Sequence, residues 1–291
     1  MKNAYIDRIH PAVCFGYFLT AIVLSMAIQH PVYLGVSILG ALLLNLQIGG
    51  RKTFRKLLIY LPLALVVTLI NPLVNTLGQT VLFSYWGRPY TLEALLYGAV
   101  VGEMLFSMLL WFSAYNAVLT DDKFSYLFGT FSPSLSLLLT TVFRMIPNQT
   151  RKLRQIMDAR KCIGKSGGDS AKETLDAGMT AISVLTSWAL ESGVTTADSM
   201  NSRGYGTGKR TCFHSYRFTL ADGLLTTVLG IGFLGVLIGV FSGNAAAEFI
   251  PAVHIAPVHP GLLGAYLVFL LTPTILNWKE DMIWHISRSK I

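Results

Sequence analysis

Residues 57–77 of this 291-residue chain read LLIYLPLALVVTLINPLVNTL, without a single charged side chain. A helix that crosses a bilayer needs about 17–25 mainly apolar residues, and this stretch has that length. Four basic residues precede it within 51–56, which is typical of the cytoplasmic end of a span. The stretch therefore predicts a membrane helix, with a bend at Asn71-Pro72, where proline removes a backbone hydrogen bond.

The whole composition agrees with this local pattern. Hydrophobic residues make up 53% of the chain and charged residues only 13%, against about 25% charged residues in a soluble domain. We predict an all-α membrane protein with about six transmembrane helices and three amphipathic cytoplasmic helices. The predicted spans are 12–28, 31–48, 57–77, 92–119, 218–241 and 260–276.

The positions of the basic residues predict the orientation. If both termini are cytoplasmic, every lysine and arginine except Arg88 lies on the cytoplasmic side, as the positive-inside rule requires. The chain then divides into an N-terminal membrane part with four spans (1–119), a cytoplasmic coupling-helix domain (120–217) and a C-terminal membrane part with two spans (218–291). Glu93 lies near the outer end of its span and is expected to be solvated.

The net charge of +8 follows mostly from this topology, and it does not predict nucleic acid binding, which needs a basic soluble face. The three cysteines Cys14, Cys162 and Cys212 form no metal or redox pattern. His254 and His259 lack a third ligand nearby in sequence, so no metal site is predicted. No nucleophile–base pair is apparent, and we expect neither an enzyme nor a cofactor.

Residues 120–217 are polar, yet they contain helical apolar stripes. A short amphipathic segment covers 123–131. A helix begins at Ser132-Pro133 and continues to Arg160, with a kink expected at Pro147. A further helix covers about 172–201. The stripe of the first long helix comprises Leu135, Leu138, Val142, Ile146, Leu153 and Ile156, and that of the second comprises Leu175, Met179, Ile182, Leu185, Ala189 and Val194.

The two long helices end alike in sequence, with a small residue, an arginine and a glycine soon after. The first ends with Ala159-Arg160-Lys161 before Gly164, and the second with Ser202-Arg203-Gly204. Either end alone is an ordinary C-terminal cap, because glycine accepts the left-handed conformation and arginine suits the helix dipole. The repetition within one insert favours two equivalent docking points.

These endings also carry a family resemblance. Residues 196–206, TADSMNSRGYG, resemble the second signature of the transmembrane T component of energy-coupling factor (ECF) transporters, a family that includes cobalt-transport permease subunits. The stretch Arg144-Met145-Ile146-Pro147, leading to Ala159-Arg160, resembles the first signature. Lys161 stands where the family usually has glycine. The resemblance extends over nearly the whole chain.

The resemblance implies a non-catalytic coupling subunit in a bacterial or archaeal cell membrane. Its partners would be two cytoplasmic ABC-type ATPase subunits and a small membrane protein that captures a vitamin or a metal ion. The implied ATPase-docking residues are Ala159, Arg160, Lys161, Ser202, Arg203 and Gly204. The alternatives are a self-contained secondary transporter or channel, and a membrane-bound enzyme. A self-contained transporter would need several polar groups that converge near the middle of the membrane. Only Asn71, Asn75 and Glu103 could contribute to such a site.

Three other patterns have simpler explanations. Residues 159–166 nearly match a phosphate-binding loop, but a polar helix precedes them instead of a buried strand. Residues 204–210 are rich in glycine with the wrong spacing and are interpreted as a hinge. Glu103 is a lone carboxylate inside a span, for which a structural hydrogen bond to another helix is the favoured interpretation.

Overall fold

The computed structural model describes residues 9–75, 78, 80–85, 88–164, 171–208, 216, 218–243, 245, 247–249 and 253–288. The chain divides into two compact units. The first, here called the membrane unit, comprises Met1–Thr120 and Tyr216–Ile291, and the second, the insert unit, comprises Asp121–Ser215. Each unit is described by itself.

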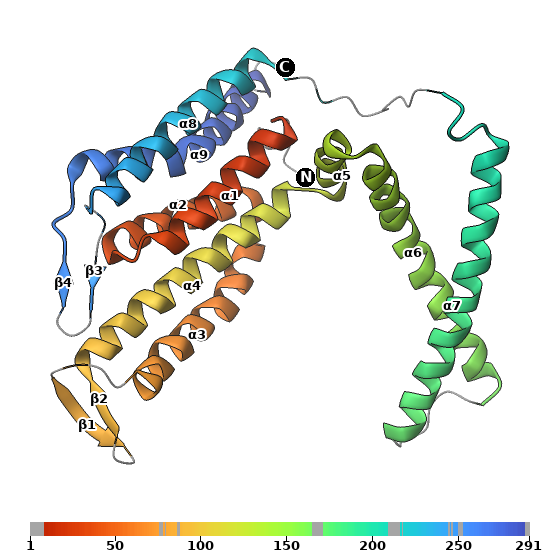
Figure 1. Cartoon of the computed structure of the whole chain (residues 1–291), viewed down its shortest axis with the longest axis horizontal. Coiled ribbons are helices and arrows are strands. Elements are labelled where there is room, and N and C mark those ends of the chain that lie inside the picture. The colour runs from red at the N-terminus through yellow and green to blue at the C-terminus, as the bar shows by residue number, and fades with distance from the viewer. Residues whose placement is uncertain are drawn as a thin grey trace. The chain divides into compact units, whose positions relative to one another are not determined.

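The membrane unit is built of long helices that lie side by side (Figure 1). They are α1 (Pro11–Ala27), α2 (Pro31–Gly49), α3 (Arg51–Val74), α4 (Leu92–Val118), α8 (Leu220–Phe241) and α9 (Pro260–Arg288). Within the described residues, five helices are long and apolar enough to cross a membrane, while α1 is shorter, with 17 residues. The predicted all-α membrane fold is confirmed.

Local chemistry sets where several of these helices begin. The side chains of His10 and His30 accept hydrogen bonds from backbone N–H groups at the starts of α1 and α2, each of which has proline in its first turn. At the start of α8, Thr219 and Asp222 form a reciprocal capping box. Asp222 also accepts a hydrogen bond from the backbone N–H of His10 at 3.2 Å, which joins the starts of α1 and α8.

Helix α4 packs against α1, α2 and α3. Its contact with α3 depends on Gly98 and Gly102, which are spaced as in a GxxxG motif. A β-carbon on Gly98 would lie 2.6 Å from the carbonyl oxygen of Thr68, and one on Gly102 would meet the Thr68 hydroxyl. The two glycines therefore allow the helix backbones to approach closely, as small residues do between helices in membranes.

A chain of buried hydroxyl groups links α1, α2 and α4. The hydroxyl oxygen of Ser37 lies 2.7 Å from that of Ser25 and 2.8 Å from that of Ser107, and it accepts a hydrogen bond from the Trp111 indole at 2.9 Å. A second group lies around Asn45, which donates to the Leu110 carbonyl and accepts from Ser113. Polar groups inside a membrane protein need such internal partners.

Two short antiparallel strand pairs occupy loops of this unit. They are β1 (Val81–Tyr85) with β2 (Arg88–Thr91) and β3 (Ala247–Glu248) with β4 (His254–Ile255). The prediction that Glu93 is solvated was wrong, because its side chain is only 6% exposed. It accepts hydrogen bonds from the backbone N–H of Thr80 at 3.1 Å and from the Thr80 hydroxyl at 2.8 Å. The β1–β2 hairpin brings Thr80 back to the start of α4 and provides these donors.

The insert unit contains α5 (Asp121–Phe131), α6 (Pro133–Cys162) and α7 (Ala171–Ser202). Helix α6 is continuous through Pro147. In α7 the buried side chains are the small ones of Ala177 and Ala181, at 2% and 1% exposure. The ammonium group of Lys152 on α6 lies 5.1 Å from the centre of the Trp188 ring on α7. Small residues and this cation–π contact hold the two long helices together.

Residues 165–170, between α6 and α7 in the sequence, lie outside the described residues. The large apolar side chains of the predicted stripes are mostly exposed on the unit itself. Leu138 is 58% exposed and Met179 is 70% exposed. The apolar stripes of α6 and α7 are thus surfaces of the insert unit and not its core.

Candidate functional site

Helix α6 continues past Arg160 and ends at Cys162. The first residue with a left-handed backbone is Gly164, with φ of 75°. Its N–H group donates to the Lys161 carbonyl at 3.0 Å. A left-handed residue costs an ordinary side chain about 1–2 kcal/mol, so glycine is the residue that suits this cap.

Arg160 therefore lies within the last helical turn, not at the tip. It is half-buried, and its Nε atom is covered and has no hydrogen-bond partner among the described residues. The two terminal guanidinium nitrogens are the ones suited to an end-on contact with a carboxylate. The ammonium nitrogen of the neighbouring Lys161 lies 3.7 Å from a carboxylate oxygen of Asp158, and both side chains are exposed. A surface pair of this kind contributes little to stability. Ala159 is exposed as well.

The end of α7 is a complete Schellman cap. The N–H of Tyr205 donates to the Met200 carbonyl at 3.0 Å, and the N–H of Gly204 donates to the Asn201 carbonyl at 3.0 Å. Gly204 has φ of 80°, as the motif requires at this position. Arg203 directly precedes this glycine, and its side chain is exposed, as is that of Ser202.

The two ends thus differ in register, although the sequence suggested that they are equivalent. Arg203 directly precedes its capping glycine, whereas Lys161, Cys162 and Ile163 separate Arg160 from Gly164. Lysine at position 161 explains the difference. A glycine there would favour an immediate cap, but Lys161 continues the helix, and the cap moves to Gly164.

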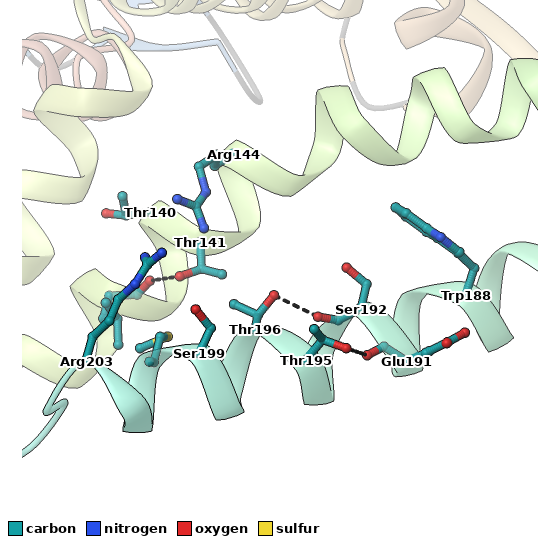
Figure 2. A pocket seen from close by; sticks show the side chains of 12 residues that line it. Thr140, Thr141, Arg144, Trp188, Glu191, Ser192, Thr195, Thr196, Ser199 and Arg203 are labelled. Carbon is teal, nitrogen blue, oxygen red and sulfur yellow. Dashed lines mark hydrogen bonds between the residues drawn. The ribbon is translucent and has the colours of Figure 1, made fainter.

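A groove with a volume of ≈910 Å³ lies between α6 and α7. It is lined by residues between Leu137 and Arg144 on one side and between Trp188 and Arg203 on the other. Figure 2 shows Arg144 projecting from α6 and Arg203 extending from the end of α7 toward Thr140 and Thr141. The groove thus brings together an arginine from each of the two stretches that carry the family resemblance.

Three of the hydroxyl groups that line this groove donate to carbonyl groups of their own helices. Thr141 donates to the Leu137 carbonyl at 2.8 Å, and Thr196 donates to the Ser192 carbonyl at 2.7 Å. These hydroxyls present oxygen atoms to the groove, while the strong donors are the guanidinium groups. The sequence placed Arg144 in a signature but predicted no role for it. The available signal was a single arginine within the otherwise uncharged first half of α6.

The chain matches the family model of the cobalt transport protein, CbiQ, over residues 3–213. This chain belongs to the cobalt transport protein family. That family is the T-component family of ECF transporters, so the resemblance found in the sequence is confirmed. The match includes α1 to α7 and all six candidate docking residues. None of the curated proteins matches the chain.

Family membership establishes a multi-pass membrane protein with a role in membrane transport. The phosphate-loop-like residues 159–162 form the C-terminal end of α6, and 163–164 follow it, which is the opposite of the helix start that such a loop requires. Lys165 and Ser166 lie outside the described residues, as do Lys209 and Arg210 of the glycine-rich stretch and Cys212. Among the described residues, no three metal-ligating side chains lie together.

The surroundings of Glu103 differ from those that the sequence analysis favoured. It lies on α4, it is partly buried, and its Oε2 atom is covered without a hydrogen-bond partner among the described residues. The interhelical hydrogen bond expected from the sequence is therefore not formed within the described part of the chain. Nothing in the structure explains why a carboxylate occupies this position.

Proposed function

We propose that this chain is the transmembrane coupling subunit of an ECF-type importer for a vitamin or a metal ion. In this role it transmits the ATP-driven motion of two cytoplasmic ATPase subunits to a small substrate-capture membrane subunit. The observation that supports the proposal most directly is the pair of arginine-bearing helix ends on one insert unit, Ala159-Arg160-Lys161 and Ser202-Arg203-Gly204.

The chemistry of these ends suits docking to proteins. A guanidinium group offers five donors in a planar fork and stays charged, so it can bind a carboxylate or several carbonyl groups with defined geometry. Each arginine is close to a capped end of a helix of about 30 residues. A helix of that length is about 45 Å long, so it can transmit a displacement over a long distance.

The exposed apolar stripes of α6 and α7 support the presence of further partners. Leu175 and Val194 on α7 are 69% and 64% exposed, and contiguous apolar surface of this kind typically marks contact with a protein or a membrane. We assign this surface to the substrate-capture subunit and to lipid, while the arginines bind the ATPases.

We further propose that both termini and residues 120–217 are cytoplasmic and that the protein lies in a bacterial or archaeal cell membrane. The concentration of lysine and arginine on one side of the predicted spans supports this orientation. Reporter domains fused after Ile291 and within 165–172 should both be active in the cytoplasm. A periplasmic or external reporter signal at either site would overturn the orientation.

A self-contained transporter is less well supported. In the membrane unit, Ser25, Ser37, Ser107 and Trp111 bond to one another, and Lys56 donates to Ser113 at 2.7 Å. Polar groups that satisfy one another in this way do not form the open, converging site that a transporter needs near the midplane.

Co-purification with ATPase subunits tests the proposal. The tagged chain, expressed with the ATPases of its own cell, should retain two ATPase subunits per chain and should support substrate uptake only with them. Uptake by the purified chain alone in liposomes would favour the transporter alternative. A chain that never retains an ATPase, although it is folded and inserted, would contradict the coupling role.

A further inference from the structure

The groove between α6 and α7 places two arginines from distant parts of the chain in one site. Arg144 belongs to the middle of α6, and Arg203 follows the last residue of α7. Neither guanidinium has a hydrogen-bond or ion-pair partner among the residues that the structure describes. Figure 2 shows both side chains in the space between the helices. Two like charges in one groove repel each other, so an anion between them would be favourable.

The opposite end of the groove has a different character. Glu191 and Trp188 line it there, and Lys152 covers the Trp188 ring. Among the lining residues that the structure describes, positive charge without a nearby acidic group is therefore found near Arg144 and Arg203, whereas Glu191 and Trp188 lie toward the other end of the groove in Figure 2. A ligand that fits this pattern must present its negative groups at the end where α7 terminates.

The size of the groove favours a chain segment over a single ion. The stretch from Trp188 to Arg203 corresponds to about 20 Å of helix, and the volume is ≈910 Å³. An inorganic phosphate or a lone carboxylate would occupy only a small part of it. A peptide segment with one or two carboxylates can contact the guanidinium pair and the hydroxyl oxygens along the remaining length.

We propose that this groove receives an acidic segment of one ATPase subunit, and that Arg144 is a second docking arginine that acts together with Arg203. The inference rests on the proposed coupling function and deepens it. Arg160 does not line this groove. The two docking sites are accordingly built differently. One is a groove formed by both helices, and the other is the end of α6 alone.

The test measures ATPase binding to the full-length chain in nanodiscs of phosphatidylcholine. All variants contain Arg160→Glu, which weakens the other docking site, so that the remaining binding reports on the groove. In this background we compare Arg144→Gln, Arg203→Gln and both together. Arg154→Gln is the matched control, since Arg154 is an exposed arginine on α6 that does not line the groove.

We expect Arg144→Gln and Arg203→Gln each to weaken ATPase binding by about tenfold or more, as loss of a hydrogen bond to a charged group does. The double variant should lose much less ATPase affinity than the product of the two single fold-losses, because both arginines bind one segment. Arg144→Lys should restore part of the affinity, which a folding defect would not allow. Arg154→Gln should bind normally.

The possible failures are distinguishable. If Arg203→Gln binds as well as the parent, the docking role of this helix end is wrong, and the proposed function loses its support here. If Arg203→Gln is defective while Arg144→Gln equals the Arg154→Gln control, only the two-arginine groove is wrong. If the Arg144 effect appears solely in discs that contain phosphatidylglycerol, the groove binds lipid headgroups, and the acidic-segment proposal is overturned.

Discussion

The two units of this protein differ in whether they bury large apolar side chains. In the membrane unit the fully buried residues include large aromatic ones, among them Phe18, Tyr33, Trp111 and Tyr266. In α7 of the insert unit the buried positions are Ala177 and Ala181, while Met179 and Leu190 are about 70% exposed. The membrane unit therefore has a packed interior of its own. In the insert unit, α7 buries only small side chains, and most of the large apolar side chains in the stripes of α6 and α7 are exposed.

The strongest test of this contrast reverses the charge of the arginines at the two helix ends of the insert unit. We expect the double variant Arg160→Glu/Arg203→Glu to lose both ATPase subunits and all ATP-driven uptake. Leaving acceptor groups of a partner unpaired typically costs about 2–5 kcal/mol at each site, and glutamate adds repulsion. Pull-down of the ATPases together with uptake measures the effect. Wild-type binding by this variant would mean that the arginines are only helix caps.

The single charge reversals sharpen the comparison within the insert unit. Each should release one ATPase and leave the other bound, because the two ends lie on different helices. Lysine at either position should recover only part of the binding, since a point charge cannot reproduce the planar fork. Native mass spectrometry of the detergent-purified complexes counts the ATPases. Simultaneous loss of both from either single variant would contradict independent docking.

A substitution in the membrane unit should affect folding instead of docking. We expect Gly98→Leu to destabilise the packing of α3 on α4, because even a β-carbon there would lie 2.6 Å from the Thr68 carbonyl oxygen. Overpacking typically costs about 1–3 kcal/mol. Thermal stability in detergent reports the change, and Gly16→Leu is the matched control, since a β-carbon at Gly16 would meet no atom within 4 Å. An unchanged melting temperature for Gly98→Leu would show that the close approach is not needed.

The capping glycine of α7 should give a smaller effect. Gly204→Ala places a β-carbon at φ of 80°, and the left-handed conformation costs about 1–2 kcal/mol for such a residue. We expect faster hydrogen exchange in the last turn of α7 and somewhat weaker binding of one ATPase, with the global fold retained. Gly208→Ala serves as the control. Identical exchange in both variants would mean that the cap does not determine the geometry of Arg203.

The smallest effect is expected in the loop before α9. His254→Ala and His259→Ala should leave uptake unchanged, because two histidines without a third ligand make a weak metal site. Uptake assays with and without a chelator check this. Metal-dependent loss of uptake in His259→Ala, with normal assembly, would restore the metal-ligand interpretation.

Hydropathy and charge predicted the helices of the membrane unit because a long apolar run with few charges is typical of a membrane-spanning helix. The helix predicted from position 57 begins at Arg51, since hydropathy does not register basic residues that still favour helix. The burial of Glu93 depends on a hairpin of two short strands, whose pattern is weak. The groove was missed because it requires knowing which faces of α6 and α7 meet, and neither helix reveals this alone.

The different placement of the two arginines relative to their capping glycines has a consequence for symmetry. Arg203 directly precedes its capping glycine, Gly204, whereas Arg160 lies three residues further from its own capping glycine, Gly164. In a helix, three residues correspond to about 4.5 Å along the axis and a rotation of about 300°. The two helix ends therefore cannot be superimposed with both their arginines and their caps aligned. Under the proposed function, the insert unit would present a differently oriented arginine to each ATPase subunit.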